Sequence, residues 1–143
     1  SYMPSRPSHA RLTVGVAVAA LGVTTLVHIA YLPRYLPDEF TRSLPYLALG
    51  WLSYGLLFYA LGRLKPALGD GRMPTMRATD VGIGLFLFSI VLSGLIDTAG
   101  LTIATAPALH ALPGVGVYVG LALAGWGFGI RTRTVNEIAA ERR

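Results

Sequence analysis

The chain has 143 residues, of which 53% are hydrophobic and only 13% are charged, and its mean hydropathy is +0.57. Because an ordinary soluble domain carries about 25% charged residues, this composition excludes a soluble enzyme, a disordered tail and a large extramembrane domain. Cysteine is absent, which excludes disulfide exchange, thiolate catalysis and cysteine-ligated clusters or haem. The net charge of +5 does not indicate a nucleic-acid partner, since Lys and Arg flank apolar runs and no base-reading module is present.

Four apolar runs follow one another along the chain, each close to the ~20 residues that a helix needs to cross a bilayer. We expect transmembrane spans at residues 12–32, 44–64, 81–103 and 112–130, followed by a basic tail over residues 131–143. Pro33 marks the end of the first span, and Asp80 together with Thr79 could cap the start of the third. The pattern predicts an all-α polytopic integral membrane protein, a single four-transmembrane-helix bundle with short loops.

One segment, residues 101–111, has no clear assignment. It is uncharged and too apolar for a typical solvated loop. It could extend the third helix, lie in the interface, or re-enter the bilayer where protein or a watery cavity covers its backbone.

The orientation follows from the distribution of Lys and Arg among the short loops. With the N-terminus in the cytoplasm, the outer loops hold Arg34 and Arg42 and every other cation is inside. The inside set is Arg6, Arg11, Arg63, Lys65, Arg72, Arg77, Arg131, Arg133, Arg142 and Arg143. This bias predicts a cytoplasmic-type membrane, both termini in the cytoplasm, and contact of the basic inner segments with anionic lipid headgroups.

Asp97 is the one carboxylate inside an apolar run. A charge at the bilayer centre costs roughly 2.5–3.5 kcal/mol on insertion scales and is a functional candidate by default. Ser89, Ser93 and Asp97 recur at every fourth position, which places them on one stripe of the third helix. Such a stripe could line an outer-facing polar pocket or an ion half-path, or it could serve only helix–helix hydrogen bonds and an interfacial carboxylate.

His28 and His110 are both expected near the outer ends of their helices, at a depth similar to that of Asp97. Two imidazoles from different helices can ligate a b-type haem, and two histidines with one carboxylate can bind a divalent metal. The plainer alternative is that one histidine is buried against a Thr or Tyr hydroxyl while the other is exposed.

Glycine is frequent, with 17 residues. In the fourth span, Gly116 and Gly120 form a GxxxG pair, and Gly125 and Gly129 repeat the spacing on a neighbouring face. Small residues at this spacing let helices approach closely. We therefore expect these glycines to pack helices, either within the bundle or between protomers.

These features favour a small, non-enzymatic membrane protein. It would act as a homo-oligomer in ligand binding or transport, or as an accessory subunit of a larger membrane complex, through an outer pocket formed by His28, Ser93, Asp97 and His110. The alternatives are a haem b electron carrier with His28 and His110 as axial ligands, and a metal-dependent membrane enzyme that uses His28, Asp97 and His110.

Overall fold

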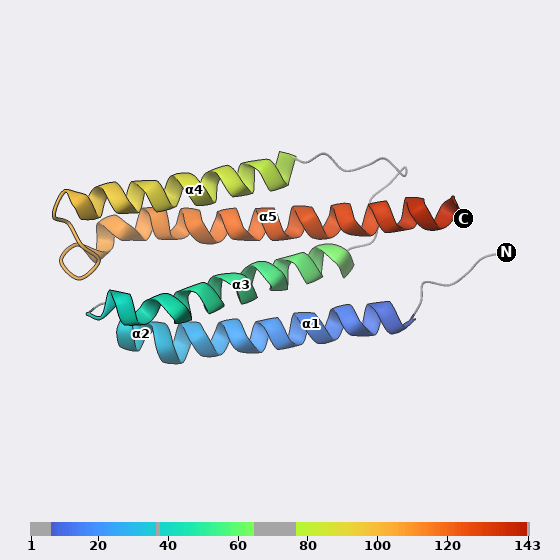
Figure 1. Cartoon of the computed structure of the whole chain (residues 1–143), viewed down its shortest axis with the longest axis horizontal. Helices are drawn as coiled ribbons and strands as arrows, with labels where there is room; N and C mark the ends of the chain where they lie inside the picture. The colour runs from blue at the N-terminus through green and yellow to red at the C-terminus, as the bar shows by residue number, and fades with distance from the viewer. Residues whose placement is uncertain (1–6, 37, 65–76, 143) are drawn as a thin grey trace.

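The computed structural model describes residues 7–36, 38–64 and 77–142, and every regular element in these ranges is helical (Figure 1). In chain order the elements are α1 (Pro7–Leu26), the π-helical turn η1 (Val27–Tyr31), α2 (Leu32–Tyr35), α3 (Phe40–Leu64), α4 (Arg77–Thr98) and α5 (Pro107–Glu141). Because α1, η1 and α2 run on as one rod, the described chain forms four long helices. The predicted all-α four-helix bundle is confirmed.

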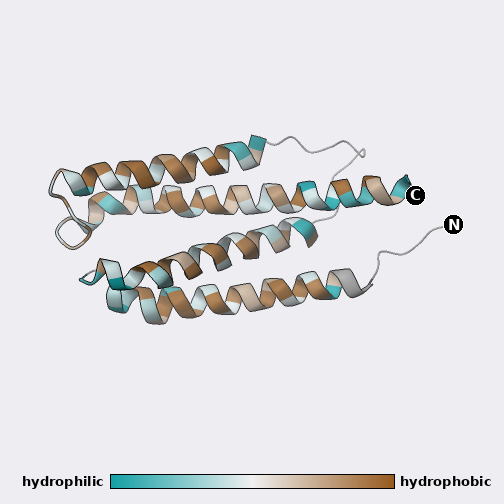
Figure 2. Ribbon diagram, viewed as in Figure 1, coloured by the Kyte–Doolittle hydropathy of each residue, from teal (hydrophilic) through white to brown (hydrophobic). Residues whose placement is uncertain are grey.

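All four rods are long and apolar enough to cross a membrane. The candidate spans are Ala10–Tyr35, Phe40–Leu64, Arg77–Thr98 and Pro107–Glu141. Hydrophobic residues occur along the whole length of all four rods (Figure 2). Many large apolar side chains are exposed, whereas many buried positions hold small or hydroxyl-bearing residues such as Ala60, Ser53 and Ser89. A water-soluble bundle buries its large apolar side chains instead. This distribution suits a lipid environment, and the protein is a membrane protein.

The helices pack in the order α1–α3–α5–α4 (Figure 1). α5 lies between α3 and α4, and α1 packs on the far side of α3. In the described part of the chain, the backbones of α1 and α5 do not come into contact, and neither do those of α3 and α4. The space between α1 and α5 is therefore spanned by side chains.

Glycines explain how α5 comes so close to both of its neighbours. Gly116 and Gly120 face α4, where a Cβ on Gly120 would lie 2.6 Å from the carbonyl oxygen of Gly82. Gly125 and Gly129 face α3, and a Cβ on Gly129 would meet the α3 backbone. Any larger residue would force the helices apart, so both glycine pairs are occupied by interfaces within this chain.

The first rod passes through Pro33, so the expected end of its helix at residue 32 is wrong. A proline removes one backbone hydrogen bond and clashes with the preceding turn of an α-helix. Here η1 widens the turn just before it, with the Leu32 N–H donating to the carbonyl of Val27. Pro33 then falls in the first turn of α2, where its missing N–H is tolerated. The rod consequently reaches Tyr35.

α4 ends at Thr98 rather than at the expected residue 103. Gly100 adopts a φ of +92°, a conformation that glycine reaches without steric cost. The Gly100 N–H donates to the Asp97 carbonyl at 2.9 Å, and the Leu101 N–H donates to the Ile96 carbonyl at 3.2 Å. These two bonds form a Schellman motif, which satisfies carbonyls at the helix end.

The unassigned segment 101–111 divides into two parts. Residues up to Ala106 form turns, in which the Thr102 N–H donates to Thr105 Oγ1 at 2.9 Å. The remainder belongs to α5, which begins at Pro107, before the expected residue 112, and continues without a break into the predicted tail. At 1.5 Å per residue its 35 residues extend about 52 Å, well beyond the ~30 Å hydrocarbon core. The basic C-terminal part of α5 therefore projects past the apolar region.

Candidate functional site

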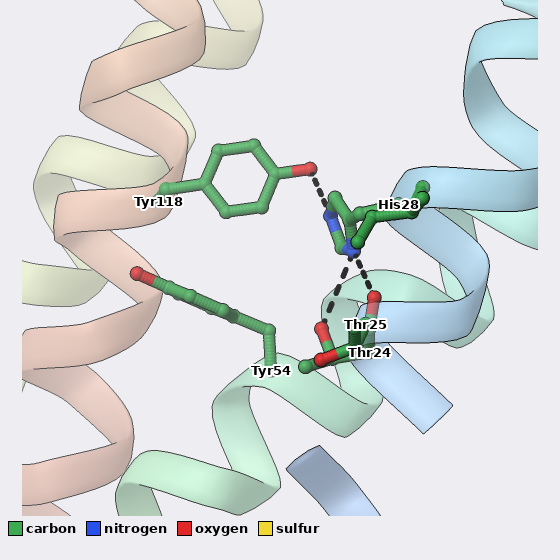
Figure 3. Close-up of a pocket in the computed structure, with 6 residues that line it drawn as sticks. Thr24, Thr25, His28, Tyr54 and Tyr118 are labelled. Carbon is green, nitrogen blue, oxygen red and sulfur yellow. Dashed lines mark hydrogen bonds between the residues drawn. The ribbon is translucent and has the colours of Figure 1, made fainter. Parts of the chain in front are cut away.

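His28 joins the first rod to α5 across the space between them. The ring lies in η1, and its Nε2 is 2.6 Å from the Tyr118 hydroxyl of α5 (Figure 3). Its Nδ1 lies 2.7 Å from the Thr24 carbonyl oxygen and 3.3 Å from Thr24 Oγ1. Both ring nitrogens are thus engaged by protein groups one helical turn away and on the opposite helix.

These contacts define the tautomer of the neutral ring. A carbonyl oxygen only accepts hydrogen bonds, so the Nδ1–H of His28 donates to Thr24 O. Nε2 then carries the lone pair and accepts the O–H of Tyr118. Thr24 Oγ1 in turn donates to the Gly50 carbonyl at 3.4 Å, which ties this network to α3.

Gly50 makes room for the histidine at the contact between the first rod and α3. A Cβ at this position would lie 2.9 Å from His28 Cε1 and 3.1 Å from Val27 Cγ1. Tight van der Waals contact therefore holds the imidazole in place from the α3 side, in addition to its hydrogen bonds.

An open groove runs beside this pair, between the first rod and α5 with α3 as its floor. It is lined by Thr24, Thr25, His28, Ile29, Tyr54 and Tyr118, a set we call the His28 groove, and has a volume of about 440 Å³ (Figure 3). This volume falls within the ~300–1,000 Å³ range of small-molecule sites. The groove is open at the side because the backbones of the two helices that border it do not come into contact.

Aromatic rings give the groove firm walls. The rings of Tyr54 and Tyr118 meet edge to face, with centroids 5.0 Å apart and planes at 89°, and the rings of His28 and Tyr118 lie 5.3 Å apart at 67°. Edge-to-face pairs of this kind are favourable beyond their buried area. No Asp, Glu, Lys or Arg is among the lining residues, so the groove presents neutral polar atoms on an aromatic surface.

His110 forms a separate centre between α4 and the first turns of α5. The residue is only 8% exposed, with its Nδ1 2.7 Å from Ser93 Oγ and its Nε2 2.6 Å from the Leu101 carbonyl. By the same argument Nε2–H donates to the carbonyl and Nδ1 accepts from Ser93. This histidine ties the turn after α4 to α5, and the expectation that one of the two histidines is exposed does not hold.

The three residues of the predicted polar stripe on α4 do not all face α5. Ser89 lies buried against Gly116, and Ser93 bonds His110, but Asp97 is exposed near the end of the helix. A spacing of four residues drifts about 40° per step on an α-helix, so two steps carry Asp97 away from the α5 interface. The structure therefore does not place Asp97 in a pocket with either histidine.

His28 and His110 are also not brought together. His110 and Tyr118, the partner of His28, are separated by two turns of α5, or about 12 Å along its axis. Two axial imidazoles must flank one iron atom, and this arrangement does not provide that. Among the described residues, no group of three or more His, Asp or Glu side chains is placed to hold a metal ion, so the predicted set of His28, Asp97 and His110 does not assemble.

The sequence interpretation missed most of the groove lining, namely Thr25, Ile29, Tyr54 and Tyr118, and it also missed Gly50, which packs against His28. Tyr118 carried the clearest signal, because a tyrosine inside the fourth span lies away from the interfaces where tyrosines gather. It was overlooked within the glycine-rich pattern. The alternative of a histidine satisfied by a Thr or Tyr hydroxyl fits His28 in its Tyr118 partner, although the ring is only half-buried and its Nδ1–H donates to the Thr24 carbonyl.

Comparison with family models, with curated proteins and with solved structures finds nothing that matches this chain. The His28 groove is therefore the feature of the molecule that bears on its function.

Proposed function

We propose that this protein binds a small, neutral amphiphilic molecule that enters the His28 groove sideways from the bilayer. The observation that carries the proposal is the groove itself, an open space of about 440 Å³ that holds a positioned His28–Tyr118 pair on a largely apolar, uncharged surface. Binding sites for small molecules combine such apolar walls with a few placed polar groups.

The cost of the polar pair supports a binding role. His28 and Tyr118 both lie inside candidate spans, where polar and ionisable groups are expensive and are retained mainly for function. α1 packs against α3, and its backbone makes no contact with that of α5. The His28–Tyr118 hydrogen bond therefore crosses to a helix against which the first rod does not pack. The pair is therefore better explained by what the groove accommodates than by helix packing.

The proposal does not depend on a second copy of the chain. The glycine pairs that suggested an oligomer are occupied by α4 and α3 of the same molecule. A homo-oligomer or a larger complex would have to use the large apolar side chains on the outside of the bundle, which a bilayer already covers.

The orientation of the protein belongs to the same proposal. One end of the bundle holds the start of α1, the end of α3, the start of α4 and the end of α5 (Figure 1). By their positions in these helices, the arginines toward this end are Arg11, Arg63, Arg77, Arg131 and Arg133, whereas Arg34 and Arg42 belong to the other end. The positive-inside rule then favours termini in the cytoplasm and contact of the projecting part of α5 with anionic lipids.

Single cysteines test this orientation, since the chain has none. In intact cells a membrane-impermeant maleimide should label Thr105→Cys directly, and Asn136→Cys only after the membrane is permeabilised. The reverse pattern would overturn the assignment.

Binding is tested with the full chain in neutral phospholipid nanodiscs. The probe is 4-octylphenol, measured by equilibrium dialysis and corrected for its partition into protein-free nanodiscs. Thr25→Trp fills the groove with a large side chain, and Val91→Trp is the matched control on the lipid-facing side of α4, where Val91 is 58% exposed.

We expect saturable binding to the wild type and to Val91→Trp, and affinity lower by at least about tenfold in Thr25→Trp, because a bulky side chain that occupies a site removes its contact area. Absence of saturable binding, or equal binding by the two tryptophan variants, would refute the proposal.

A further inference from the structure

We infer that the ligand of the His28 groove bears a hydroxyl group, as a lipid-soluble alcohol or phenol does, and that Tyr118 accepts the hydrogen bond of that hydroxyl. This inference rests on the proposed function and deepens it by naming the chemical class of the ligand. It follows from the direction of each hydrogen bond in the network around His28.

The Thr24 carbonyl determines which group donates in each hydrogen bond around His28. The Thr24 carbonyl only accepts, so the neutral His28 donates from Nδ1 and accepts at Nε2. The Tyr118 O–H is therefore committed to Nε2, at 2.6 Å. What Tyr118 has left is the lone-pair side of its oxygen, which is an acceptor.

The other polar atoms in the groove are hydroxyls. Thr25 and Tyr54 line the same space, and each hydroxyl is able to donate as well as accept. A ligand hydroxyl matches the free side of the Tyr118 oxygen, because it is able to donate a hydrogen bond to it. A ketone, ester, ether or quinone oxygen only accepts, so it leaves that side of the Tyr118 oxygen without a partner.

The uncharged lining of the groove and its depth in the candidate span restrict the class of ligand further. No charged side chain lines the groove. His28 lies seven positions before Tyr35, where the candidate span ends, and this distance corresponds to about 10 Å along the helix. A phospholipid headgroup carries charge that this depth disfavours, whereas a neutral hydroxyl on an apolar body does not.

A chain of hydrogen bonds then forms from the ligand O–H to Tyr118, from Tyr118 to His28, and from His28 to Thr24. Hydrogen bonds in such a chain polarise and strengthen one another in a low-dielectric interior. The Trp51 indole is not part of the groove lining, but its buried ring N–H lies close to the Tyr118 hydroxyl and draws on one lone pair of that oxygen, which leaves the other lone pair for the ligand.

The experiment compares 4-octylphenol with 4-octylanisole, its methyl ether, in the nanodisc assay with the same correction for partition. For the wild type we expect the phenol to bind about fivefold more tightly, a ratio typical of one net hydrogen bond. Equal binding of the two probes would overturn the inference and leave the proposed function standing. Failure of both probes to bind would refute the proposed function itself.

Two variants of His28 sharpen the test. His28→Phe keeps a planar ring but removes the acceptor, so the Tyr118 O–H becomes free to donate to the ether and the preference should fall to about one. His28→Gln restores an acceptor carbonyl in reach of Tyr118, so the preference for the phenol should return. A preference that persists in His28→Phe would contradict the role of Tyr118 as acceptor, and thermal unfolding of each variant identifies any that fails to fold.

Discussion

The two histidine centres of this bundle share one hydrogen-bonding pattern in different surroundings. In each centre one ring nitrogen donates to a backbone carbonyl and the other accepts a hydroxyl hydrogen, with Tyr118 serving His28 and Ser93 serving His110. The difference lies in what surrounds them. His110 closes the turn between two tightly packed helices, whereas His28 lies beside a groove between two helices whose backbones do not come into contact. A histidine in a span therefore does not by itself indicate a binding site, and the packing of its neighbours decides its role.

The largest expected effect is the loss of stability when His110, which closes the turn after α4, is replaced. His110→Ala leaves the Leu101 carbonyl and the Ser93 hydroxyl without their partner, and burial of an unsatisfied polar group costs about 1–3 kcal/mol. We expect the free energy of unfolding, measured by titration with SDS, to fall by about this amount. Binding of 4-octylphenol to the folded fraction should stay unchanged, and a selective loss of binding would contradict the separation of the two centres.

A smaller effect is expected at Gly50, which supports the other centre. Gly50→Ala places a methyl group 2.9 Å from His28 Cε1, so the imidazole must shift and its bond to Tyr118 weakens. Overpacking of this kind costs about 1–3 kcal/mol, and relief by movement of the ring toward the groove keeps the stability loss near the lower end.

The matched control is Gly55→Ala on the same helix, where a Cβ meets nothing within 4 Å. The control should be neutral or slightly stabilising, because alanine favours a helix by up to about 1 kcal/mol over glycine. The affinity for 4-octylphenol should fall in Gly50→Ala and not in Gly55→Ala. Equal affinities in the two variants would show that the position of His28 does not govern the groove.

This contrast also explains which features the sequence could predict. Long uncharged runs and their flanking arginines contain the information for four helices, because span length and charge are properties of a local segment. The predicted helix ends were less accurate where the backbone conformation, and not hydropathy, determines the end. At Gly100 a positive φ ends α4 although apolar residues continue beyond it. Pro33 misled in the opposite sense, since η1 lets the rod pass through it.

The candidate site depended on contacts between distant segments. His28 could be identified as an unusual residue, but its partner Tyr118 lies 90 positions away, and the rotation of both helices determines whether the side chains meet. Glycine spacing predicted close packing of the fourth span without indicating that one pair faces α4 and the other α3. Asp97 illustrates the limit most clearly, because its periodic spacing with Ser89 and Ser93 did not keep it in the interface.

The smallest expected effect concerns Asp97, for which the structure and the spacing in the sequence predict different results. If Asp97 belonged to a ligand pocket, Asp97→Asn would abolish binding. The structure places it exposed at the end of α4, beside the turn and away from the His28 groove. Asp97→Asn should therefore leave the affinity for 4-octylphenol unchanged, and it should alter the free energy of unfolding by no more than about 0.5 kcal/mol, as surface substitutions do. The backbone carbonyl of Asp97, which accepts the Gly100 N–H, is retained in the variant. A marked loss of binding would restore the carboxylate to the site and remove the distinction between the groove and the outer end of the bundle.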